Sequence, residues 1–460
     1  IGLAVVVAGI IWRDLWLGVL GVILVAAVCG LALLRAVRVD LPNHNFGICP
    51  GVTQNVHGKP ALTDWLADRI DMVAGNVGAD GKPGDPLTVG QLAECAVAIA
   101  TMTTDLSSHR PYQLPLKSRH HFFSKREFEK LFPKRVVDYL VRDRTPLAGV
   151  GQDVPDDLYQ LASGPDFPVL LVARMSLSFP GLISAVPLYR FDNQLPDAPR
   201  AARVRRCLFS DGGISSNFPI HFFDAFLPSR PTFGITLASW EKVRHGDDRV
   251  HLPSKPHQST DLPVQAINGI GDFLGSILNT AKDWHDTLQS LLPGYSERIV
   301  EVRLDDSKEG GLNLAMDEAT IRRLGEYGRK AGQKLVTDFE FDEHRWLRAV
   351  SLMPELEEAL EGMAAAYRRA PAVGGGGQGF TYAQVLTDHA PQSYVNSKTW
   401  REKVLKPFVD SLVWIGDRAA QAHAVEGKRS VRKGERPNVD SHLRLTASAD
   451  RAPVQTSEPN

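Results

Sequence analysis

The sequence Cys207-Leu-Phe-Ser-Asp-Gly-Gly-Ile-Ser-Ser-Asn-Phe-Pro219 places a short apolar run directly before an aspartate and two glycines. The apolar run Cys207 to Phe209 predicts a buried strand, and the paired glycines favour a sharp turn with positive φ and a close approach to a neighbour. Asp211 is then expected at the exposed carboxyl end of the strand, where ligands collect in open α/β sheets. Asp-Gly-Gly is also an ordinary turn signal, so a purely structural role for Asp211 stays open.

Two further stretches also combine an apolar run with small or polar residues typical of turns. Ala173-Arg-Met-Ser-Leu-Ser-Phe-Pro-Gly-Leu-Ile-Ser-Ala-Val-Pro-Leu-Tyr189 combines small residues with a Pro-Gly pair and an apolar run, and Ala98-Ile-Ala-Thr-Met-Thr-Thr-Asp-Leu106 ends an apolar run in Thr-Asp-Leu. Together with the Asp211-Gly212-Gly213 motif they resemble the patatin-like phospholipase family over roughly residues 87–237. The resemblance implies an α/β fold, a three-layer sandwich with a central sheet that is incomplete in this chain. It also implies a Ser-Asp dyad in which Asp211 is the catalytic aspartate.

The nucleophile of such a dyad is not found in the sequence. In the patatin-like family the serine lies on a Gly-x-Ser-x-Gly elbow behind a glycine-rich oxyanion loop, but no serine here has glycine at both positions two residues away. Gly374 to Gly377 follow a helical segment downstream of Asp211, so we interpret them as a flexible linker. Ser176 and Ser178 lack the strained strand-to-helix turn, and the resemblance assigns them to packing near the site. Because the chain opens on Ile1 inside an apolar run, we expect a longer protein whose upstream part carries the elbow.

Residues 1–38 predict a membrane segment, with a truncated helix at 1–11 and a full transmembrane helix at 15–34. A signal peptide or a buried core helix is the alternative. Arg35 and Arg38 follow the second helix, so the positive-inside tendency puts the large downstream part in the cytoplasm. Residues 39–425 are then the patatin-like hydrolase domain, and residues 426–460, rich in charge, Ser and Pro, predict a disordered tail.

The composition narrows the classes of partner and cofactor. A net charge of −1 over 460 residues provides no field for nucleic acid, and 43% hydrophobic residues suit a large soluble region. The four cysteines are too widely spaced for a zinc pattern or a disulfide framework, which fits a reducing compartment; they are Cys29, Cys49, Cys95 and Cys207. Asp305-Asp306 with Gly310-Gly311 has the wrong ligand spacing for a calcium loop. His120, His121 and His221 are isolated from other ligand types, so we expect no metal and no cofactor.

Apolar periodicity and helix-cap signals predict the remaining elements. Helices are expected at 62–73, 125–132, 168–177, 317–339, 344–369 and 404–424, and strands at 96–102, 120–123, 185–189, 207–209, 232–237 and 298–304. Residues 273–292 have helical spacing. Residues 240–262 are rich in charge, His and Pro, and predict a surface insertion without regular structure.

The function expected from this resemblance is a membrane-tethered lipid acyl hydrolase that cleaves carboxylic ester bonds. Its partners would be an acyl-lipid substrate and the bilayer, and the chain by itself, lacking the serine and the oxyanion loop, should be inactive. The alternative is a noncatalytic, membrane-anchored binding or scaffold protein of the same fold.

Overall fold

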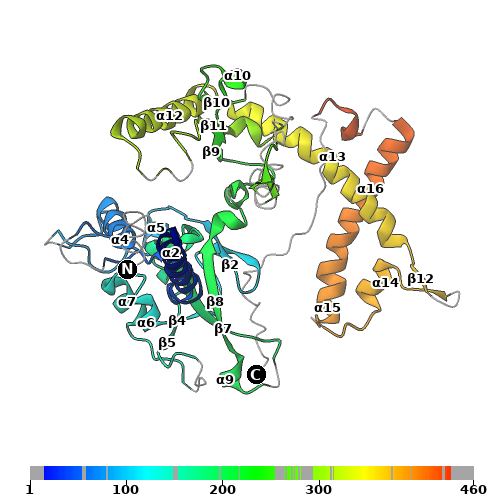
Figure 1. Ribbon diagram of the computed structural model, residues 1–460. Helices are drawn as coiled ribbons and strands as arrows, with labels where there is room; N and C mark the ends of the chain where they lie inside the picture. The colour runs from blue at the N-terminus through cyan, green and yellow to red at the C-terminus, as the bar shows by residue number, and fades with distance from the viewer. Residues whose placement is uncertain are drawn as a thin grey trace. The chain divides into compact units, whose positions relative to one another are not determined.

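The computed structural model describes residues 15–53, 58–78, 81–148, 154–195, 198–216, 218–253, 264, 267–270, 273, 275–277, 280, 294–310, 313, 315–373, 377–393, 395–426 and 430–436. The chain divides into two compact units, one formed mainly by residues 1–219 and the other mainly by residues 220–446. Each unit combines helices and strands (Figure 1), so the expected α/β class is confirmed, with several sheets in place of one central sheet.

The described part of the first unit opens with a long apolar helix, α2 (Leu15–Arg35), drawn in dark blue in Figure 1. It continues through a π-helical stretch, η1 (Ala36–Asp40), into α3 (Leu41–Asn43). By length and composition the stretch Val19–Asn43 can cross a membrane, and a signal sequence would have the same properties. The predicted helix at 15–34 is therefore confirmed as a helix, whereas the one at 1–11 lies outside the described residues.

A six-stranded sheet forms the centre of the first unit, and every pair of neighbouring strands in it is antiparallel. Its strand order is β3 (Arg110–Leu114), β2 (Thr101–Asp105), β8 (Val204–Asp211), β7 (Val186–Phe191), β4 (Phe122–Ser124) and β5 (Leu158–Gln160). The argument that ligands gather at the carboxyl ends of parallel strands is therefore wrong for β8, because its neighbours run the opposite way. The strand predicted at 96–102 begins only at Thr101, after α5 (Val89–Glu94) has ended and Ala96 has turned the chain with a φ of 57°.

Short helices and loops pack around this sheet. The helices are α4 (Leu62–Val73), α6 (Lys125–Phe128), α7 (Lys134–Val141), α8 (Val169–Ser176) and α9 (Arg200–Arg203), with a 3-10 turn, η2, at Gly164–Asp166. The predicted helix at 62–73 is confirmed at both ends, and the one at 125–132 stops at Phe128. The core between helices and sheet is apolar and aromatic, with Phe123, Phe128, Leu171 and Phe209 fully buried. Beside it, β1 (Gly47–Cys49) pairs in parallel with β6 (Gly181–Ile183).

The second unit contains a three-stranded sheet of order β10 (Val250–His251), β11 (Ile299–Leu304) and β9 (Gly234–Ser239), on which α12 (Glu318–Thr337) packs. Its other helices are α10 (Lys242–His245), α13 (Phe341–Arg368), α14 (Tyr382–Thr387), α15 (Lys398–Trp400) and α16 (Lys406–Glu426). Short 3-10 turns occur at Ile220–Phe223 and Ser296–Arg298, and a π-helical stretch at Arg401–Leu405 leads into α16. The predicted helices at 317–339 and 344–369 and the strand at 298–304 are confirmed to within a few residues.

Three expectations for the second unit need correction. The insertion at 240–262, expected to lack regular structure, contains α10 and β10. Val250 of β10 packs in the apolar core under α12, which accounts for the strand. The glycine linker is partly wrong, since Gly377 lies in β13 (Gly377–Gln378), which pairs with β12 (Ala372–Val373). The tail is ordered at 430–436, where Arg432 in the 3-10 turn η8 (Val431–Lys433) forms ion pairs with Glu357 and Glu361 on α13. Residues 437–460, and most of 273–292, are not among those that the structure describes.

Candidate active site around Asp211

Asp211 is the last residue of β8, directly opposite Thr103 of β2. Its side chain is partly buried, and one carboxylate oxygen accepts a hydrogen bond from the amide of Gly213 at 2.6 Å. That bond caps the 3-10 turn η3 (Gly212–Ile214) that follows the strand. The structural role left open by the sequence is therefore present, because the carboxylate stabilises its own turn.

Gly212 serves close packing and not an unusual backbone conformation. Neither Gly212 nor Gly213 has a positive φ, which corrects the expectation from the sequence. Instead, a Cβ on Gly212 would lie 2.1 Å from the carbonyl oxygen of Met102, far inside van der Waals contact. The turn after Asp211 therefore presses its backbone against β2, and only glycine fits at its first position.

The loop after α8 holds the end of β8 from a second direction. The carbonyl oxygen of Ser178 accepts hydrogen bonds from the amide of Asp211 at 3.0 Å and from the hydroxyl of Ser210 at 2.9 Å. Thr103 adds a third bond, donating its hydroxyl to the carbonyl of Ser210 at 2.8 Å. Asp211 is thus fixed at its backbone, and the residue as a whole is only partly buried.

The serines near Asp211 are engaged in packing and in turn contacts. Ser178 is fully buried and its hydroxyl donates to the carbonyl of Arg174 at 2.8 Å, so an ester carbonyl cannot reach it. The hydroxyl of Ser215 donates to the carbonyl of Gly212 at 3.1 Å and lies 3.0 Å from the hydroxyl of Thr104. Ser176, at the end of α8, is partly buried.

A buried group of ionisable side chains lies in the core of the same sheet. His121 is 3% exposed, its two ring nitrogens have no hydrogen-bond partner, and its ring packs edge-on against Tyr112 and Phe209. Burial lowers the pKa of His121 to about 4 and raises the pKa of the Cys207 thiol to about 11. Both groups are therefore uncharged at neutral pH, which suits core packing better than proton transfer.

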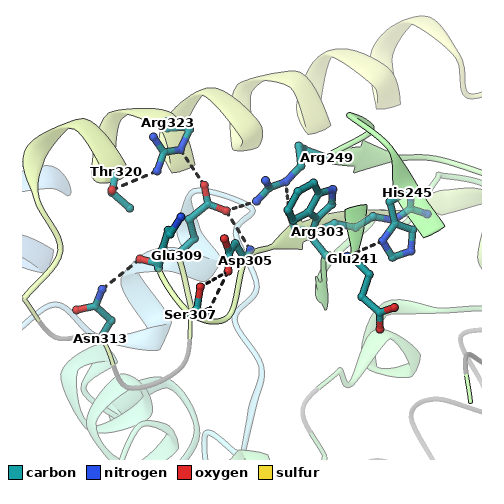
Figure 2. A network of polar contacts seen from close by, with 12 residues as sticks. Glu241, His245, Arg249, Arg303, Asp305, Ser307, Glu309, Asn313, Thr320 and Arg323 are labelled. Carbon is teal, nitrogen blue, oxygen red and sulfur yellow. Dashed lines mark hydrogen bonds and ion pairs between the residues drawn. The ribbon is translucent and has the colours of Figure 1, made fainter. Parts of the chain in front are cut away.

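The Asp305-Asp306 loop of the second unit is closed by internal contacts. Figure 2 shows Asp305 accepting hydrogen bonds from the amide and the hydroxyl of Ser307, at 3.1 and 2.6 Å. In the same view the buried carboxylate of Glu309 pairs with Arg249 and Arg323 and accepts a bond from the amide of Asp305. Within the described ranges, no group of three or more His, Cys, Asp or Glu side chains is arranged to hold a metal ion.

One residue near Asp211 was missed by the sequence reasoning. Arg174 on α8 is fully buried and donates a 2.5 Å hydrogen bond to the hydroxyl of Ser178. A sequence signal existed, because Arg174 is the one charged residue in the otherwise apolar run Val169–Met175. A lone charge on a buried helix face indicates a specific polar contact. The side chains of Asn217 and His221, which follow the motif in sequence, are outside the part of the chain that is described.

Comparison with known proteins finds one related sequence. The chain is 33% identical over 465 residues to the RpoH suppressor of Rhizobium meliloti (strain 1021), with 87% of this chain and 71% of that protein covered. No protein-family model and no solved structure matches the chain. At this identity and coverage, the chain belongs to the same family as the RpoH suppressor.

Proposed function

We propose that the protein is a membrane-tethered lipid acyl hydrolase with a patatin-like sandwich fold, in which Asp211 is the base of a Ser-Asp dyad. The observation that carries the proposal is the anchored end of β8, where a backbone bond to Ser178 holds Asp211, a residue that is only partly buried. A base that must act on one hydroxyl needs such fixed geometry, since misplacement of about 1 Å can cost roughly a hundredfold in rate.

The reaction would be acyl transfer to a serine followed by hydrolysis. Asp211 would accept the proton of the serine hydroxyl as its oxygen attacks the ester carbonyl, and water would then release the acyl group. Because no Gly-x-Ser-x-Gly sequence occurs in the 460 residues, the proposal places the nucleophile and the oxyanion loop outside them. Ile1–Asn460 alone should accordingly be inactive.

Two further features support a lipid substrate at a membrane. Phe179, the residue after Ser178, is 47% exposed, which puts an apolar side chain beside the anchored end of β8. The stretch Val19–Asn43 can cross a membrane, and its side chains are largely exposed, as lipid contact requires. An enzyme held at the bilayer would meet acyl chains at high local concentration.

A noncatalytic scaffold is the second candidate function, and one contact favours it. The hydrogen bond from the Gly213 amide gives Asp211 a role in its own turn, so the motif could persist without chemistry. The name of the Rhizobium meliloti relative refers to RpoH and specifies no reaction. Experiment therefore has to separate the two functions.

Asp211→Asn in the complete reading frame makes this separation. Asparagine keeps an oxygen that can accept the Gly213 amide, so the turn is retained, but it cannot take up the serine proton. We expect hydrolysis of p-nitrophenyl acyl esters and of phospholipid vesicles to fall to the uncatalysed rate, with an unchanged melting temperature.

Asp317→Asn provides the matched control. Asp317 caps α12 through a 2.6 Å bond from the amide of Thr320, so the substitution repeats the same chemical change at a helix cap in the other unit. Its activity should equal that of the wild type. Normal hydrolysis by Asp211→Asn would refute the dyad, whereas no hydrolysis by the complete wild-type protein would favour the scaffold.

A further inference from the structure

Arg174 is a charged residue in an apolar setting. It lies on α8 with its side chain fully buried, and the residues around it in the helix belong to the core of the first unit. Burial lowers its pKa to about 10, so the guanidinium remains protonated at neutral pH. Among the residues that the structure describes, no carboxylate forms an ion pair with it.

Its hydrogen bonds instead go to four neutral oxygens on three separate segments. Nε donates to the hydroxyl of Thr63 at 3.3 Å and Nη1 to the hydroxyl of Ser178 at 2.5 Å. Nη2 donates to the carbonyls of Pro50 at 3.3 Å and Ser184 at 2.9 Å. The side chain thereby joins α4, the segment after β1, and both ends of the loop that carries β6.

Burial of Arg174 is energetically unfavourable compared with filling the same core volume with an apolar side chain. Burying a guanidinium without an ionised partner costs more desolvation energy than burying a methionine or leucine of similar size. The planar fork of arginine does, however, fix several acceptors in defined directions, which no aliphatic side chain can do. The contacts therefore point to a positional role.

The surrounding backbone is built closely around this side chain. A Cβ on Gly51 would lie 2.2 Å from the Thr63 hydroxyl and 3.5 Å from Nε of Arg174, and Gly51 has a φ of 94°. A Cβ on Gly47 would lie 2.1 Å from the amide of Ser184. Both segments approach the Arg174 contacts in a way that only glycine permits.

The contacts of Arg174 lead directly to Asp211. Ser178 receives the guanidinium at its hydroxyl and donates that hydroxyl back to the carbonyl of Arg174 at 2.8 Å. The carbonyl of the same Ser178 then accepts the amide of Asp211 and the hydroxyl of Ser210. One buried residue therefore lies between the guanidinium and the backbone of the proposed base.

We infer that Arg174 is a positioning residue that fixes Ser178 and, through the Ser178 carbonyl, the backbone of Asp211. The expected effect on catalysis rests on the proposed function. The positioning of the Asp211 backbone by Arg174 does not depend on it. It assigns Arg174 no contact with substrate.

The test uses the complete reading frame with Arg174→Gln, Arg174→Lys, Ser178→Ala and the Arg174→Gln/Ser178→Ala pair. Hydrogen exchange of the peptide spanning residues 210–216 reports on the anchor without any need for activity. We expect Arg174→Gln to speed exchange there at least tenfold and Arg174→Lys to restore most of the protection. The peptide spanning residues 299–304 should be unchanged.

The kinetic parameters of the same variants provide a second test. Arg174→Gln should lower kcat roughly 10- to 100-fold with KM within about threefold, because orientation is lost while substrate binding is retained. Ser178→Ala should have a smaller effect of the same kind, and the double variant should be no worse than Arg174→Gln. Arg298→Gln is the control for loss of a fully buried arginine, since Arg298 pairs with Asp224 in the other unit. It should lower the melting temperature and leave kcat unchanged.

Each outcome decides one of the two proposals. Unchanged exchange at residues 210–216 in Arg174→Gln, or additive effects of the two substitutions, would overturn the positioning role. If Arg174→Gln does not fold, Ser178→Ala carries the test by the same exchange measurement. Normal activity of Asp211→Asn would instead refute the dyad while leaving the exchange result valid.

Discussion

The carbonyl oxygen of Ser178 accepts the backbone amide of Asp211 at 3.0 Å, so the loop after α8 and the end of β8 share a hydrogen bond outside the sheet ladder. The two residues lie far apart in sequence but are bound at their backbones. The Asp211 side chain can therefore differ in chemistry without a change in its position. This separation of backbone anchoring from side-chain chemistry is what makes substitutions at Asp211 informative.

Gly212→Ala should destabilise the first unit. Its Cβ would lie 2.1 Å from the Met102 carbonyl, and moving a strand end to relieve that clash should cost about 1–3 kcal/mol. Urea unfolding of the detergent-solubilised protein measures the loss. Gly84→Ala is the control, because Gly84 is exposed and a Cβ there meets no atom within 4 Å. Equal stability of the two variants would show that the turn does not press on β2.

His121 should make the stability of the first unit depend on pH. Its folded pKa is about 4 and its ordinary value is 6.5, so between these values the unfolded chain binds a proton that the folded chain excludes. Stability is therefore complete above pH 6.5 and is lost as the pH falls toward 4. The loss between pH 7 and pH 5 should be about 2 kcal/mol.

Replacing the ring tests this dependence directly. His121→Leu should remove most of the change in unfolding free energy between pH 7 and pH 5, whereas His120→Leu, at an exposed position, should keep it. The measurement is a pair of urea titrations for each variant. A wild-type slope retained by His121→Leu would mean that other groups titrate in this range.

Glu309→Gln should weaken the second unit through its arginine partners. The carboxylate is 4% exposed and pairs with Arg249 and Arg323, so its neutralisation leaves the largely buried Arg249 without a counter-charge. We expect a loss of about 1–3 kcal/mol in unfolding free energy. Glu326→Gln removes an exposed i,i+3 pair with Arg329 and should cause no measurable change. Indistinguishable melting curves for the two variants would contradict the importance of the network.

The apolar helix can be tested by fractionation. Leu24→Arg combined with Val28→Arg places two charges near the middle of α2, each costing about 2.5–3.5 kcal/mol at the centre of a bilayer. The double variant should move from the carbonate-resistant membrane fraction toward the soluble fraction. Val243→Arg, at a 99% exposed position in the second unit, should stay with the membrane as the wild type does. A wild-type protein already in the soluble fraction would argue against a membrane anchor.

Patterns of local origin predicted the fold best. The helix at 62–73 and the two long helices after residue 317 follow from apolar spacing, to which α12 adds the capping residue Asp317. Such signals depend only on neighbours in sequence. Strand direction did not follow, because an apolar run such as Cys207 to Phe209 has the same pattern in parallel and antiparallel sheets. The antiparallel pairing of β8 is set by contacts with β2 and β7 that are distant in sequence.

The sequence predicted the Asp-Gly-Gly motif of the candidate site but not the buried arginine that holds the neighbouring loop in place. Asp211 and the close approach of Gly212 follow from an Asp-Gly-Gly turn after a strand. Arg174 does not, because its importance lies in neutral oxygens such as those of Pro50 and Ser184, which carry no signature in sequence.

Under the proposed membrane anchoring, the parallel pairing of β1 with β6 would limit how far Asp211 can lie from the bilayer. Only residues 44–46 separate the end of α3 at Asn43 from β1 at Gly47, a span of at most about 14 Å. Because Gly47 is paired with Gly181, a bilayer-crossing helix that ends at Asn43 would hold β6, and with it the loop of Ser178, at the height of the lipid head groups. The short connection between α3 and β1 would then fix the distance between Asp211 and the lipid surface.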